Sequence, residues 1–136
     1  KTIKSIFMKS VLIIEDEAIS ALMLKKVLSK YFITEVVENS EKCKQICSSR
    51  GFDFVLLDIN LGPNSEDGLH VLKNLKANPL FENTHFCAVT ANALPGDKEK
   101  YLRLGFDNYF PKPIIFDEII ERIQSVKKNN TIGRNS

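Results

Sequence analysis

The chain has 136 residues, of which 43% are hydrophobic and 26% are charged, and its formal net charge is +2. This length fits one domain with a single core, and so weak a charge excludes a strongly basic nucleic-acid binder or a membrane-surface protein. No segment approaches the roughly 20 consecutive apolar residues of a membrane span, and three widely placed cysteines argue against a disulfide scaffold. We therefore expect one globular, cytoplasmic domain without membrane insertion or direct nucleic-acid binding.

Five short apolar runs predict the strands. In chain order they are residues 11–14, 35–37, 54–57, 86–89 and 109–110. The first and third runs are continuous rather than alternating, which is typical of strands covered on both faces of a parallel sheet.

Five further segments are predicted to be helices: residues 18–31, 40–49, 68–78, 97–104 and 115–123. The spacing of Leu24, Leu28 and Tyr31 predicts that the first helix buries one face. The last is amphipathic, through a row of isoleucines at Ile115, Ile119, Ile120 and Ile123. Because strands and helices alternate, the sequence predicts a parallel α/β sheet with helices on both faces.

Smaller features have two readings. A second apolar row in the first helix, formed by Ile19, Met23 and Val27, either widens the core-facing stripe or forms a docking patch. The cysteines and histidines form no converging set of ligands, so we expect ordinary thiols and imidazoles. We expect the lysine pairs at 25–26 and 127–128 to be solvated.

Polar side chains follow four of the predicted strands at the point where each strand ends. Glu15 and Asp16 follow the first strand, Asp58 the third, Thr90 the fourth and Lys112 the fifth. In open parallel α/β sheets, ligands bind at the carboxyl ends of the strands. The sequence therefore predicts one site at this edge, built from these five residues.

Three carboxylates at one edge repel one another, and a hard divalent cation with oxygen ligands relieves that repulsion. We predict a Mg²⁺ site, which Mn²⁺ could also fill. Beside it Asp58 would be a nucleophile that forms an acyl phosphate. Lys112 would stabilise charge on the transferring phosphoryl group, and Thr90 would donate a hydrogen bond to it.

From about Lys9 to Val126 the chain resembles the receiver domain of two-component response regulators. The resemblance rests on four motifs in the correct order: Glu15-Asp16 after Val11-Leu12-Ile13-Ile14, then Val55-Leu56-Leu57-Asp58-Ile59-Asn60, Val89-Thr90-Ala91 and Lys112-Pro113-Ile114. The segment 91–114 is similar to receivers attached to hybrid sensor histidine kinases. The chain departs from the family pattern in the loop 61–67, which is longer by two residues.

The resemblance implies a doubly wound (βα)5 flavodoxin-like sandwich of three layers, with a five-stranded parallel sheet in the order 2-1-3-4-5. It divides the chain into a leader or expression remnant at 1–7, a receiver domain at 8–128 and a polar tail at 129–136. It also implies a cis peptide bond between Lys112 and Pro113.

The resemblance implies a phosphoacceptor that takes a phosphoryl group onto Asp58 from a phosphohistidine. The donor would be a sensor histidine kinase or a histidine phosphotransfer domain. Asp16, Asp58 and the backbone carbonyl of Asn60 would bind Mg²⁺, and Glu15 would act directly or through water. Lys112 would pair with Asp58 before phosphorylation.

The resemblance also implies a conformational switch. Thr90 would move toward the phosphoryl group, and Tyr109 would rotate in behind it. Asn60 and Asn92 occupy positions that tune the lifetime of the phosphorylated state. A homodimer through the fourth helix, the fifth strand and the fifth helix is a further expectation.

Three alternatives stay open. A Mg²⁺-dependent phosphohydrolase with an aspartyl nucleophile needs a general acid two residues after Asp58, where Asn60 stands. A flavin-binding module needs a phosphate loop after the first strand, where the acidic residues 15–17 would repel a phosphate. A pseudo-receiver scaffold would lack the intact set of residues. We therefore expect a signalling switch rather than a multiple-turnover enzyme.

Overall fold

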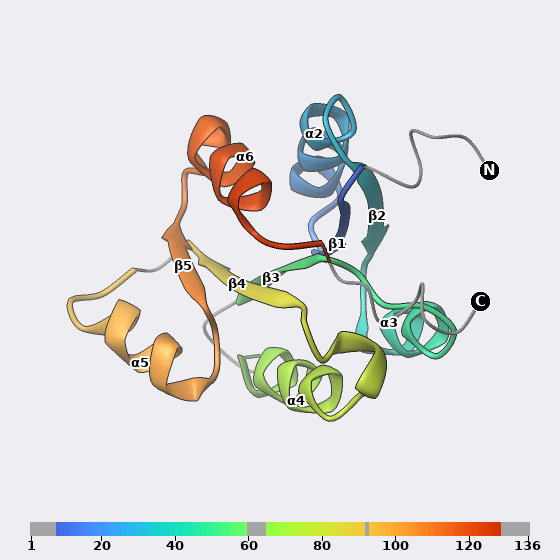
Figure 1. Ribbon diagram of the computed structural model, residues 1–136. Coiled ribbons are helices and arrows are strands. Elements are labelled where there is room, and N and C mark those ends of the chain that lie inside the picture. The colour runs from blue at the N-terminus through green and yellow to red at the C-terminus, as the bar shows by residue number, and fades with distance from the viewer. Residues whose placement is uncertain (1–7, 60–64, 92, 129–136) are drawn as a thin grey trace.

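The computed structural model describes residues 8–59, 65–91 and 93–128, with side chains described from Gly68 onward in the second range. A five-stranded parallel sheet has the order β2-β1-β3-β4-β5 (Figure 1). The strands are β1 (Ser10–Ile14), β2 (Ile33–Val37), β3 (Phe54–Ile59), β4 (His85–Thr90) and β5 (Asn108–Pro111). The helices are α2 (Ala18–Leu28), α3 (Ser40–Cys47), α4 (Ser65–Lys76), α5 (Asp97–Leu104) and α6 (Phe116–Ser125), with a short 3-10 helix at Pro79–Phe81. The predicted flavodoxin-like fold and strand order are confirmed.

Helices cover both faces of the sheet: α2 and α6 lie on one face, and α3, α4 and α5 on the other (Figure 1). Alternate residues of β1 enter the two layers, so that Leu12 packs toward α3–α5 and Ile13 toward α2 and α6. A strand buried on both faces has no solvated side. This explains why β1 and β3 are continuous apolar runs.

The first helix is shorter than its sequence pattern predicts. It ends at Leu28, and Tyr31 lies in the following turn with 48% of its surface exposed, so the prediction that Tyr31 is a core residue is wrong. Phe32 is buried instead, at 4% exposure. The chain has left helical geometry there, so the helical period no longer decides which side chain faces the core.

The structure corrects one other prediction about helix faces and decides between the two readings of the second apolar row of α2. Ile115 is not part of the buried row of α6, because it occupies the N-cap position and is 58% exposed, whereas Ile119 and Ile123 are buried. In the second apolar row of α2, Ile19 and Met23 do not widen the core stripe, since they are 67% and 52% exposed, whereas Val27 is half-buried.

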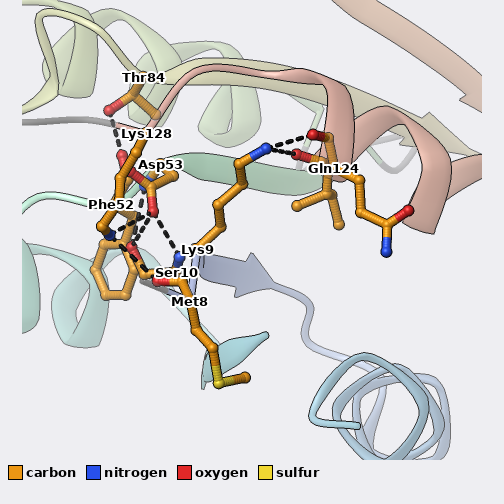
Figure 2. Close-up of polar contacts among 9 residues, drawn as sticks. Met8, Lys9, Ser10, Phe52, Asp53, Thr84, Gln124 and Lys128 are labelled. Carbon is orange, nitrogen blue, oxygen red and sulfur yellow. Dashed lines mark hydrogen bonds and ion pairs between the residues drawn. The ribbon is translucent and has the colours of Figure 1, made fainter. Parts of the chain in front are cut away.

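A cluster of polar contacts ties the two ends of the domain together at the amino ends of the strands. Figure 2 shows Ser10 and Lys128 directed at Asp53, which is almost fully buried. The Asp53 carboxylate accepts hydrogen bonds from Ser10 N–H (2.7 Å) and Ser10 Oγ (3.2 Å), and it pairs with Lys128 Nζ at 3.2 Å. Lys9 Nζ donates to the carbonyl of Ile123 at the end of α6. The prediction that Lys128 is solvated is therefore wrong.

Among the described residues, no helix has both the length and the apolar character that crossing a membrane requires.

Candidate functional site

The structure brings the predicted polar residues to the carboxyl edge of the sheet. Glu15 directly follows β1, Asp58 is the penultimate residue of β3, Thr90 ends β4 and Lys112 directly follows β5. The strands end nearly level, because Ile14 pairs with Leu57, and Thr90 pairs with both Ile59 and Pro111. A backbone hydrogen bond from Lys112 N–H to Thr90 O (2.8 Å) fixes the start of the loop after β5.

Three carboxylates meet at this edge. One oxygen from each of Glu15, Asp16 and Asp58 lies within 4.8 Å of the other two, and they range from buried Glu15 to exposed Asp16. They open into a cavity of about 220 Å³ between β1, β3, the start of α3 and α4. A small ligand or ion can therefore reach the carboxylates from solvent.

Lys112 neutralises part of this acidic cluster. Its Nζ lies 3.2 Å from Oδ1 of Asp58 and 3.3 Å from Oε1 of Glu15. Burial alone would lower the pKa of Lys112, but the two carboxylates outweigh burial and raise it. The ammonium group therefore stays charged. The Lys112–Pro113 peptide bond is cis, as the sequence motif predicts.

The surroundings of Glu15 disfavour the ionised form of its carboxyl group. Burial raises its pKa to about 7, the neighbouring Asp58 adds to that rise, and the N–H of Glu17 and the charge of Lys112 only partly oppose it. Glu17 itself takes no part in the cluster, because its carboxylate caps α2 by accepting from the N–H groups of Ile19 and Ser20. The cluster thus contains more negative charge than one lysine compensates.

These residues fit a divalent cation. The buried Oδ1 of Asp58 accepts no hydrogen bond from any described residue, although Lys112 lies at ion-pair distance. An oxygen that forms an ion pair but no hydrogen bond still has lone pairs to satisfy, and hard cations take carboxylate oxygens of this kind. The donor set is oxygen only, which suits Mg²⁺ better than a soft metal.

Thr90 and Tyr109 lie on β4 and β5, the two strands that follow β3 in the sheet. Thr90 is almost fully buried at the end of β4. Tyr109 is half-buried on β5, and its ring stacks on that of Tyr101 with centroids 5.5 Å apart. The two residues predicted to tune the lifetime, Asn60 and Asn92, lie outside the described residues, as do the leader, the tail and residues 61–64 of the long loop.

Sequence reasoning missed two contacting groups. One is Tyr101, the only aromatic residue in the highly charged segment 97–104, and that contrast marks an inward-facing position. The other is Asp53, whose position directly before an apolar strand signals burial. Nothing in the local sequence identifies Lys128 as the partner of Asp53.

Comparison with known proteins agrees with this geometry. The family model of the response regulator receiver domain matches residues 11–124. The transcriptional activator protein IrlR of Burkholderia pseudomallei is 32% identical over 117 residues, which are 85% of this chain and 49% of that protein. The polar-differentiation response regulator DivK of Brucella anthropi is 31% identical over 118 residues, or 86% of this chain and 94% of DivK. The chain thus spans about half the length of one curated relative and nearly all of the other.

Solved structures show the same fold. A CheY-like response regulator receiver domain from Methylobacillus flagellatus superposes with a TM-score of 0.74 at 28% identity and covers 88% of this chain and 99% of its own. The receiver domain of sensor histidine kinase PA1611 from Pseudomonas aeruginosa, described with a magnesium ion in its active-site cleft, has a TM-score of 0.73 at 24% identity, over 86% and 95% of the two chains. The chain belongs to the response regulator receiver domain family of two-component signalling.

Proposed function

We propose that this domain accepts a phosphoryl group on Asp58 from a phosphohistidine and changes conformation in response. The observation that supports this most is the position of Asp58. Its carboxylate is in the sheet edge, 3.2 Å from the Lys112 ammonium and within 4.8 Å of Glu15 and Asp16, at the floor of an open cavity.

The transfer needs one bond formed and one broken. A carboxylate oxygen of Asp58 attacks the phosphorus, the bond between phosphorus and the donor imidazole nitrogen breaks, and that nitrogen takes up a proton. The Lys112 ammonium, now paired with Asp58, contacts the incoming phosphoryl oxygens and offsets their charge. Thr90 donates its hydroxyl hydrogen to another of these oxygens, which draws its side chain toward the phosphoryl group.

The cofactor we propose is Mg²⁺, for which Mn²⁺ can substitute. Asp16, Asp58 and the backbone carbonyl of Asn60 would hold it, with Glu15 directly or through water. When bound, it neutralises charge on the phosphoryl oxygens and on the acidic cluster. The raised pKa of Glu15 supports this assignment, because burial and, after it, the neighbouring Asp58 disfavour the Glu15 charge, and a cation would stabilise that charge.

The donor-docking surface we propose is the exposed apolar side of α2, which begins three residues after Glu15. Ile19, Leu22 and Met23 are 67%, 68% and 52% exposed there. Contiguous exposed apolar side chains of this kind mark interfaces. A sensor histidine kinase or histidine phosphotransfer domain would present its histidine from a helical bundle on this patch.

A second surface, formed by α5, β5 and α6, is the one we propose for a homodimer. We also propose a cytoplasmic location, which the three buried free thiols of the described chain support because reducing compartments keep thiols unpaired.

Incubation with acetyl phosphate and Mg²⁺ tests the phosphoacceptor. The intact protein should gain one phosphoryl group by mass spectrometry, and the linkage should be stable in acid and labile in base. Asp58→Asn should gain none, whereas the control Asp117→Asn, on the exposed side of α6, should behave as the wild type. Continuous turnover of a phosphate ester would instead identify a phosphohydrolase, and an unmodified wild type would identify a pseudo-receiver.

A further inference from the structure

Tyr109 lies in an inward position against α5. It pairs with Ala88 in the β4–β5 register and packs on the α3–α5 side of the core. Its ring lies nearly parallel to that of Tyr101, with centroids 5.5 Å apart and an interplanar angle of 12°. Aromatic pairs at this separation attract one another beyond the area that they bury.

Tyr101 is the more deeply buried member of this pair. Only 3% of its surface is exposed, and the ring of Phe106 meets it edge-on at 6.0 Å. The N–H of Phe106 also donates to the carbonyl of Tyr101 at 3.1 Å, which joins the end of α5 to the segment before β5. These contacts fix the Tyr101 ring, so that Tyr109 can stack on it and turn away from it.

No hydrogen bond from a described residue holds Tyr109 inward. Its hydroxyl oxygen is buried and has no hydrogen-bond partner among the described residues. A buried hydroxyl without a partner costs free energy, so the stack and the surrounding apolar contacts must offset that cost. The Tyr109 ring would consequently lose its stacking contact with Tyr101 if it turned outward.

We propose that Tyr101 is a positioning residue that holds Tyr109 inward and so biases the domain toward its signalling conformation before any phosphoryl group is bound. This rests on the proposed function, in which Tyr109 lies inward behind Thr90 in the phosphorylated state. Stacks of this kind shift an equilibrium between two ring positions by about two- to twelvefold. Removing the Tyr101 ring would therefore weaken, by up to this factor, the binding of a ligand that requires Tyr109 to be inward.

Beryllofluoride, a phosphoryl analogue, tests this in the presence of Mg²⁺, with backbone amide NMR shifts near Asp58 as the measure of binding. Tyr101→Leu keeps an apolar side chain but loses the stack, so its apparent affinity for beryllofluoride should fall measurably, by up to about twelvefold. Tyr101→Phe keeps the ring and should match the wild type. Tyr31→Leu, at an exposed and distant tyrosine, is the matched control.

The outcomes separate the two proposals. If the wild type does not bind beryllofluoride, the proposed function is wrong and this inference fails with it. If the wild type binds and Tyr101→Leu binds equally well, the inference alone is wrong. A loss shared equally by Tyr101→Leu and Tyr101→Phe would also overturn it, because the ring would not be the cause.

The ring contact can be measured without any variant. The chain has three tyrosines and no tryptophan, so ¹³C labelling of tyrosine gives a simple aromatic spectrum. We expect a nuclear Overhauser effect between the rings of Tyr101 and Tyr109 in the free protein. Its absence would overturn the inference, which therefore stays testable if Tyr101→Leu does not fold.

Discussion

The contacts of Asp53 predict a large and specific loss of stability on truncation of this side chain. Asp53→Ala removes the acceptor of the Ser10 N–H, which is buried and would be left without a partner, at a cost of about 1–3 kcal/mol. The Ser10 hydroxyl loses one bond but still accepts from Asp53 N–H at 3.1 Å, so its cost is smaller. The pair with Lys128 adds up to about 1 kcal/mol, discounted because the lysine side chain is 36% exposed.

These contributions sum to a destabilisation of about 3 kcal/mol, or roughly 12 °C in melting temperature for a domain of this size. Asp53→Asn keeps an acceptor for Ser10 N–H and loses mainly the ion pair, so it should cost about 1 kcal/mol. Lys128→Met should cost a similar amount, because it removes the same pair from the other side. Lys127→Met, at the exposed neighbouring lysine, should change stability by less than about 0.5 kcal/mol.

Urea unfolding followed by circular dichroism and by tyrosine fluorescence measures all four variants. The loss of unfolding free energy in the double variant Asp53→Asn/Lys128→Met should not exceed the summed losses of the two single variants, since the second change removes an ion pair that the first has already broken. If Asp53→Ala unfolds at the wild-type midpoint, or if Lys127→Met costs as much as Lys128→Met, the cluster in Figure 2 does not stabilise the domain.

Three further predictions concern the site and the core. The folded pKa of Glu15, about 7, lies above its ordinary value, so the free energy of unfolding falls as pH rises toward and through 7 and Glu15 ionises. Glu15→Gln removes this ionisation and should therefore stabilise the metal-free protein by about 1–2 kcal/mol more at about pH 8 than at about pH 5. Equal effects at both pH values would contradict this. Lys112→Ala should leave the fold intact, but phosphorylation of Asp58 should no longer change the NMR signals of the Tyr109 ring; a change as large as that in the wild type would remove the role of Lys112. Leu28→Ala, at a fully buried site in α2, should cost about 2–5 kcal/mol in urea unfolding, whereas the exposed Leu22→Ala should cost less than about 0.5 kcal/mol.

Local sequence was sufficient for the elements that are specified by composition and period. Continuous apolar runs identified β1 and β3 because strands buried on both faces need no polar side. The site could be located because each strand of a parallel sheet presents its carboxyl end at the same edge, so that Glu15, Asp58 and Lys112 had to meet. No long-range contact had to be known for either inference.

The contacts between distant segments could be decided only by the tertiary structure. A helical period tells which face is apolar but not where the helix stops, so it predicts a buried Tyr31 where Phe32 is the buried residue. Lys128 looks like any terminal lysine until the end of α6 brings it to the buried Asp53, 75 residues away. The stack of Tyr101 on Tyr109 likewise depends on how α5 packs against β5, because a side chain's partner is set by packing in three dimensions and not by its neighbours along the chain.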